Sequence, residues 1–142
     1  MITPISGIRK AFYHEVEQLC AELKITGVSW PNTQFIAPFD TYVQPFIQYV
    51  DTSTVSLGES GYEQTTGFFQ LTIVGRPDVG EKELDKVVES TLSRFHSGKR
   101  ISVVGDIYLT ITSSYRNSLI IEDGRPFVAV TSNFTIYTPK GV

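Results

Sequence analysis

The run Gly67-Phe68-Phe69-Gln70-Leu71-Thr72-Ile73-Val74 decides the fold of this 142-residue chain. Phe69, Leu71 and Ile73 alternate with neutral residues in its second half, and a period of two is typical of a strand with one buried face. The C-terminal segment 125–138 repeats this alternation and is predicted to be a second such strand. Its expected inward-facing residues are Val128, Val130, Phe134 and Ile136.

Two segments have the spacing of three and four between apolar residues that is typical of amphipathic helices. Residues 5–24 place apolar side chains on one face, and we expect Gly27 to end this helix because glycine accepts a left-handed turn. Residues 81–96 form the second predicted helix. It has acidic residues at its start and Arg94 near its end, and both complement the helix dipole.

Three further strands and a hairpin turn are predicted, at 45–50, 101–104, 107–115 and 122–124. The resulting order, α-β-β-α-β-β-β, indicates an α+β fold with two helices packed on a mainly antiparallel sheet. The length suits a single domain spanning residues 1–142. Residues 51–66 are rich in Ser, Thr, Gly and Glu, so we expect a long and mobile hairpin tip there.

The composition excludes several classes of protein. Twelve Lys and Arg against fifteen Asp and Glu give a net charge of −3, which argues against a protein that mainly binds nucleic acid. The single cysteine, Cys20, cannot form an internal disulfide, which fits a reducing compartment. Neither a signal-peptide layout nor an apolar run of about 20 residues occurs, so we expect a soluble cytosolic domain without a membrane span.

Motifs for catalysis, metal binding or cofactor binding are not convincing. The stretch 75–82 approaches a phosphate loop, but Glu81 stands where that loop requires Lys. His14, His96 and Cys20 are too few for a structural zinc site. No serine lies in a Gly-x-Ser-x-Gly turn of the kind that presents a nucleophile. We therefore predict no catalytic residue, no metal and no cofactor, and a protein that is not an enzyme.

The most informative feature is an absence of charge. Four stretches that coincide largely with predicted strands contain no Asp, Glu, Lys or Arg, namely 41–50, 64–75, 107–115 and 127–138. Burial in the core explains the lack of charged residues at the inward-facing positions only. A solvated sheet face usually carries Lys or Glu, whereas charge depletion is typical of the core of a protein interface. We therefore expect that another protein surface covers this face of the sheet. The alternative is a solvent-exposed face that is simply rich in Thr and Tyr. The candidate subunit-interface residues are Tyr108, Thr110, Thr112, Thr131, Thr135 and Tyr137.

Short aromatic and glycine landmarks extend over nearly the whole chain. They are Val28-Ser29-Trp30-Pro31-Asn32, Phe35, Pro38, Tyr42-Val43, the run that begins at Gly67, the helix entered at Gly80 and the closing Phe134-Thr135-Ile136-Tyr137-Thr138. In this arrangement the sequence resembles the phage tail terminator family. The resemblance implies a small α+β structural protein of the virion tail, assembled in the host cytoplasm as a six-membered ring of identical subunits. Such a ring caps the tail tube, stops polymerisation of the tail tube protein and provides the docking surface for the head–tail connector protein.

Two further sets of contacts are expected if this resemblance holds. The hairpin tip would meet the tube or the neighbouring subunit through Glu59, Tyr62 and Glu63. Basic side chains would meet acidic neighbours or line a pore through which DNA passes in transit, and the candidates are Arg76, Arg94, Lys99, Arg100 and Arg116. Two alternatives stay open: another head–tail joining ring protein, and a small-molecule or peptide-binding α+β domain that uses the sheet face as a pocket.

Overall fold

The run that begins at Gly67 lies in the middle of a curled sheet. The computed structural model describes residues 4–54, 61–77 and 80–139. Within these residues seven strands pair in the order β1-β2-β3-β7-β5-β4, with β6 paired to β7 at one end. All neighbours are antiparallel except β1 and β2. The elements are α1 (Pro4–Leu23), β1 (Gly27–Val28), β2 (Tyr42–Thr54), β3 (Tyr62–Val74), α2 (Lys82–Arg94), β4 (Arg100–Val104), β5 (Ile107–Arg116), β6 (Ile120–Glu122) and β7 (Arg125–Pro139).

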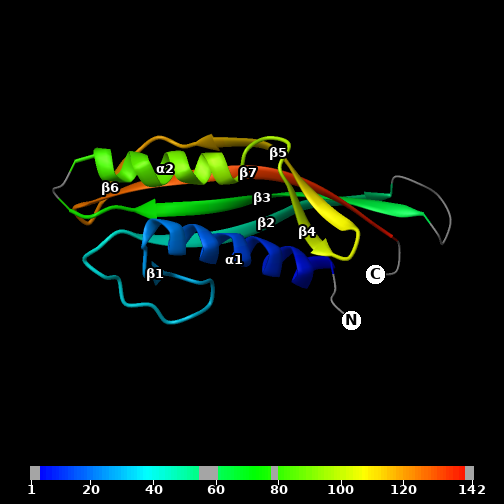
Figure 1. Cartoon of the computed structure of the whole chain (residues 1–142), viewed down its shortest axis with the longest axis horizontal. Coiled ribbons are helices and arrows are strands. Elements are labelled where there is room, and N and C mark those ends of the chain that lie inside the picture. The colour runs from blue at the N-terminus through cyan, green and yellow to red at the C-terminus, as the bar shows by residue number, and fades with distance from the viewer. Residues whose placement is uncertain (1–3, 55–60, 78–79, 140–142) are drawn as a thin grey trace.

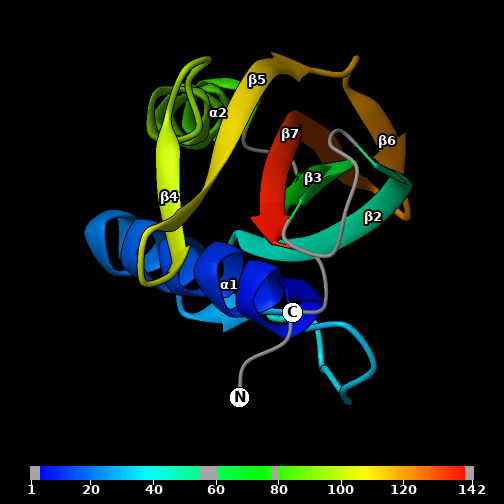
Figure 2. The same cartoon turned by 90° about the vertical axis from the view of Figure 1, so that its right-hand side faces the viewer.

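Both helices pack on the same, inner face of the sheet, and the sheet curls around them (Figures 1 and 2). The Phe12 ring of α1 stacks on the Phe69 ring of β3 with centroids 4.5 Å apart. It also meets the Phe134 ring of β7 edge-on at 5.2 Å. All the inward residues expected on β3 and β7 are at most 1% exposed. The predicted α+β class and the predicted core face are therefore confirmed.

The helix boundaries agree with the sequence to within two residues, but the reason that α1 ends is different. Lys24 takes the left-handed conformation with φ of 59°, and the Ile25 N–H donates to the Cys20 carbonyl at 2.9 Å. The prediction that Gly27 ends the helix is wrong. Gly27 lies in β1, where a Cβ atom would stand 2.9 Å from the Cβ of Tyr42, so it is close packing that requires glycine.

The polar segment 51–66 is mostly strand. The ladder between β2 and β3 continues from the Asp51–Thr66 pair to the Thr54–Glu63 pair, so the expected long tip is wrong over these residues. Thr-rich sequence suits a strand as well as a loop, because the β-branched side chain favours the pleated backbone. Residues 55–60, which include Glu59, lie outside the described residues. The short strands β1 and β6 are additions to the predicted order.

A partly buried cation joins the two helices. The Arg94 guanidinium of α2 donates from Nη1 to Glu15 Oε2 of α1 at 2.7 Å and also pairs with Glu22. The Arg94 and Glu15 side chains are only 13% and 14% exposed. Burial lowers the pKa of Arg94, but the hydrogen bonds and charges of Glu22 and Glu15 outweigh it, and the pKa is raised overall. The pair therefore fixes α2 against α1 above the core.

Candidate assembly surface

The second face of the sheet, here called the outer face, carries no Asp, Glu, Lys or Arg in its central rows, from the Gln44–Thr72 pair to the Gln48–Phe68 pair, and Asp51 of β2 lies at its margin opposite Thr66. Cross-strand register places Phe46 of β2, Gln70 of β3, Thr131 of β7 and Tyr115 of β5 in one row. The neutral residues of this face on β2, β3, β7 and β5 include Gln44, Phe46, Gln48, Gln64, Thr66, Phe68, Gln70, Thr72, Tyr108, Thr110, Ser113, Tyr115, Ala129, Thr131, Asn133, Thr135 and Tyr137.

Polar groups on the outer face bond to one another. The Gln64 amide donates to Thr135 Oγ1 at 3.1 Å and to the Tyr137 hydroxyl at 3.2 Å. The Asn133 amide donates to Ser113 Oγ at 2.8 Å. These bonds hold the side chains in fixed positions without any ionised partner. The exposed aromatic rings stand between them, and they are Phe46, Tyr108, Tyr115 and Tyr137.

The six residues predicted for the interface lie on β5 and β7, and the structure places them unequally. Thr110 and Thr135 are direct cross-strand partners, and Tyr137 lies two residues further along β7. Thr131 is on the same face but only 5% exposed, because its hydroxyl donates to the Asn117 side chain at 3.0 Å. Thr112 is the extra residue of a β-bulge between Ile111 and Ser113.

That bulge moves residues between faces. Strict alternation along β5 from Tyr108 would turn Ser114 outward. The bulge instead turns Ser114 inward, where its hydroxyl donates to the Phe95 carbonyl, and it turns Tyr115 outward opposite Thr131. Tyr115 is therefore an outer-face aromatic that sequence reasoning misses, because nothing in the composition marks the inserted residue.

The described contact residues of the hairpin lie next to Tyr137, one of the interface candidates. Tyr62 and Glu63 begin β3, at the end of the sheet opposite β6 (Figure 1). Tyr62 is half-exposed, and Glu63 is partly buried opposite Thr138, the neighbour of Tyr137 on β7. Glu59 lies outside the described residues. Tyr62 thus extends the outer-face surface toward this end, whereas Glu63 is on the other face of the strand.

The five predicted basic residues form two groups rather than one surface. Arg94, Lys99 and Arg100 follow one another at the end of α2 and the start of β4, and the Arg100 guanidinium lies 4.5 Å over the Tyr108 ring. Arg76 and Arg116 lie near the first turn of α2. Arg76 pairs with Glu83 at 2.6 Å, and Arg116 pairs with Asp85 at 3.2 Å. Three of the five cations therefore have carboxylate partners within their own chain.

A further arginine, Arg125, which sequence reasoning misses, organises one end of the sheet. Arg125 donates from Nε to the Gly75 carbonyl at 2.9 Å and from Nη1 to the Pro38 carbonyl at 2.6 Å. Its Nη2 donates to the Phe39 and Asp40 carbonyls at 3.1 and 2.9 Å. Backbone carbonyls leave no signal in the sequence, so this clamp on the loop before β2 could not be predicted.

The described residues hold no group of three or more His, Cys, Asp and Glu that could bind a metal ion. Burial raises the pKa of the Cys20 thiol to about 11, so the thiol stays protonated at neutral pH and is a poor nucleophile. In the part of the chain that the structure describes, neither helix has the length and apolar character needed to cross a bilayer.

Fold and surface together define a small α+β protein with helices on one sheet face and a second face that bears aromatic side chains and no charge in its central rows. A family model described as phage tail terminator protein matches residues 7–134. The chain belongs to the phage tail terminator family and is a structural protein of phage tails, as the resemblance in its sequence indicates.

Comparison with solved structures gives the same fold at low sequence identity. One solved chain, which carries no functional name, aligns with a TM-score of 0.75 and 20% identity. The alignment covers 94% of this chain and 96% of that chain. It therefore supports the fold alone. No curated protein matches the sequence.

Proposed function

We propose that six copies of this chain form a ring that caps the tail tube, stops its polymerisation and provides the docking surface for the head–tail connector. The family membership supports a tail protein. The uncharged outer face supports the ring, because it has the composition of a protein interface core and not of a solvated sheet. Assembly takes place in the host cytoplasm, and DNA passes through the finished pore.

The single observation that carries this proposal is the row of uncharged residues that the strand register aligns across β2, β3, β7 and β5, namely Phe46, Gln70, Thr131 and Tyr115. At strand spacings of about 4.8 Å and rises of about 3.3 Å per residue, the outer face measures roughly 19 Å by 30 Å. Specific interfaces cover about 800 Å² on each partner. The outer face is thus large enough to form the centre of one subunit contact, which then extends onto adjoining surfaces.

The remaining candidate residues have defined places in this ring. Tyr62 and Glu63, with Glu59, contact the tube or the next subunit at the hairpin end. Lys99 and Arg100, which form no ion pair within the described part of the chain, face acidic neighbours or the pore. Weak contacts suit a pore through which DNA moves, so a chain with a net charge of −3 is compatible with this role.

Electron microscopy of the purified protein mixed with unterminated tail tubes tests the proposal. We expect density confined to one end of each tube, with six-fold symmetry. The double substitution Thr110→Glu/Thr135→Glu places two carboxylates opposite each other on the outer face and should abolish capping. Ser93→Glu, on the exposed side of α2, is the matched control and should cap normally. Bare tube ends with the unaltered protein would contradict the proposal.

A further inference from the structure

One end of the sheet exposes both apolar and acidic residues. Phe39 is 66% exposed and Ile121 is 72% exposed, although both are large apolar residues. The Arg125 clamp and the pairing of Arg125 with Glu122 bring Phe39 and Asp40, in the loop before β2, toward β6 at this end. We call this surface the acidic apolar end, and its residues are Phe39, Asp40, Ile120, Ile121 and Glu122.

Charge distinguishes this end from the rest of the assembly surface. Asp40 and Glu122 are exposed, and neither forms an ion pair with another described residue. The two arginines of the same region are engaged within the chain, Arg125 with backbone carbonyls and Arg76 with Glu83. The acidic apolar end also adjoins the outer face, since β6 pairs with the first residues of β7.

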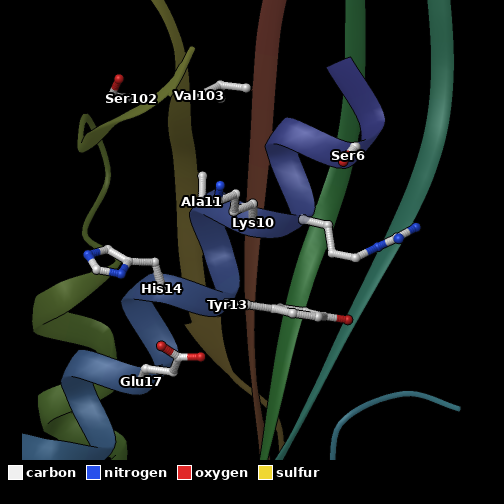
Figure 3. Close-up of a pocket in the computed structure, with 9 residues that line it drawn as sticks. Ser6, Lys10, Ala11, Tyr13, His14, Glu17, Ser102 and Val103 are labelled. Carbon is white, nitrogen blue, oxygen red and sulfur yellow. The ribbon is translucent and has the colours of Figure 1, made fainter. Parts of the chain in front are cut away.

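A hollow of about 600 Å³ lies between α1 and β4, away from this end. Figure 3 shows Lys10, Ala11 and His14 projecting from α1, with Ser102 and Val103 of β4 beside them. Ala11 and Val103 supply an apolar lining. The hollow is open to solvent and offers an apolar surface to projecting aliphatic side chains.

Two cations, Arg9 and Lys10, are among the residues that line this hollow, which we call the basic hollow. Arg9, Lys10 and His14 lie along one stretch of α1, and Glu17 is the single carboxylate among the lining residues. The Arg9, Lys10 and His14 residues are exposed. The basic hollow and the acidic apolar end are therefore complementary in charge, and a projecting surface is matched with a recessed one.

We propose that the acidic apolar end of one copy seats in the basic hollow of the next copy. This inference rests on the proposed ring and identifies the second of the two different surfaces that a closed, head-to-tail ring requires. Two acidic ends repel each other, and so do two basic hollows. The charges therefore disfavour a two-fold dimer through either surface and favour contacts that run in one direction around the ring.

The test is an exchange of charge between two variants. Variant A is Arg9→Glu/Lys10→Glu in the hollow, and variant B is Asp40→Lys/Glu122→Lys at the end. Alone, each places like charges across every contact, so capping of tail tubes should fall at least about tenfold. In a 1:1 mixture the reversed hollow of A meets the reversed end of B, and the unaltered hollow of B meets the unaltered end of A. An alternating six-membered ring then has every contact matched, so capping should return to within about twofold of the unaltered protein.

Electron microscopy counts the capped tube ends, native mass spectrometry reports the composition of the mixed rings, and thermal unfolding shows that each variant is folded. A matched control, Lys86→Glu/Glu89→Lys, reverses two exposed charges on α2 and should cap normally. Capping by A or B alone at the level of the unaltered protein would overturn the inference and leave the proposed ring intact. A mixture that stays inactive would also overturn it. Failure of the unaltered protein to cap any tube would refute the proposed function itself.

Discussion

The two faces of strand β3 come from alternate residues of one short run, yet they differ in every chemical respect. Phe69, Leu71 and Ile73 face the helices and are almost completely buried. Phe68 and Gln70 face the other way, among neutral neighbours that are partly exposed. Apolar periodicity thus records burial inside the chain, whereas in the proposed ring the scarcity of charge on the second face reflects burial between subunits.

That contrast predicts how substitutions on the two faces divide between stability and assembly. Inner-face changes should lower the free energy of unfolding of the subunit. Outer-face changes should leave it nearly unchanged and affect assembly instead.

Phe134→Ala should have the largest effect. Phe134 is 1% exposed and packs edge-on against Phe12, so its removal leaves a cavity beneath both helices. We expect a loss of about 3 to 5 kcal/mol in the free energy of unfolding, measured by chemical denaturation. Phe46→Ala removes the same side chain from the outer face, where the ring is half-exposed, and should lose about 1 kcal/mol or less. Equal losses at the two positions would show that the two faces contribute equally to the stability of the subunit.

Arg94→Met should follow, because it leaves the Glu15 carboxylate buried without its cation. We expect a loss of about 2 to 3 kcal/mol, below the range for fully buried pairs because Glu22 is exposed. A raised pKa in a cation gives a stabilisation that is lost only in strong alkali, so the loss should be the same from about pH 6 to pH 9.

Two controls sharpen this second prediction. The double substitution Arg94→Met/Glu15→Leu removes both charges and should recover most of the loss. Arg116→Met breaks the exposed pair with Asp85 and should lose no more than about 0.5 kcal/mol. If Arg116→Met lowered the free energy of unfolding as much as Arg94→Met, burial would not explain the contribution of the Arg94–Glu15 pair to stability.

Arg125→Met tests the clamp that holds the loop before β2 at one end of the sheet. The change removes hydrogen bonds to four backbone carbonyls, those of Gly75, Pro38, Phe39 and Asp40. We expect a loss of about 1 to 2 kcal/mol, because part of this site is exposed and water replaces some of the bonds. Hydrogen exchange should quicken at the start of β2. Arg125→Lys keeps the charge but not the fork of donors, so it should recover less than half of the loss.

The inner face could be predicted from the sequence because burial on one side of a strand imposes a period of two. The outer-face composition could be predicted as well, since the charge-free stretches fall on strands. What could not be predicted is the register, because β-bulges at Tyr49/Asp51 and Ile111/Ser113 insert residues that no composition marks. The bulge in β5 alone exchanges the faces expected for Ser114 and Tyr115.

Contacts between residues distant in the chain could not be predicted from the sequence for a related reason. Gly27 looks like a helix terminator, but its lack of a side chain is required by Tyr42, fifteen positions later in the chain. Arg125 looks like the start of a strand, but its partners are carbonyls that every residue possesses. The resemblance to a family gives the class of protein, whereas the clamp, the acidic apolar end and the basic hollow exist only once the chain is folded.

Gln70→Lys should have the smallest effect on the subunit and gives the sharpest test of the comparison. Gln70 lies in the middle of the outer face, between Phe46 and Thr131 in the cross-strand row. A lysine there can extend its ammonium into water in the free subunit, so the free energy of unfolding should change by no more than about 0.5 kcal/mol. In the ring the same ammonium would be buried against an uncharged partner surface, and desolvation without a counter-ion opposes assembly. Capping of tail tubes should therefore be lost while thermal unfolding stays unchanged, and Gln70→Asn, which keeps the amide, should cap normally. A lysine variant that caps as well as the unaltered protein would show that water, and not protein, lies against this face.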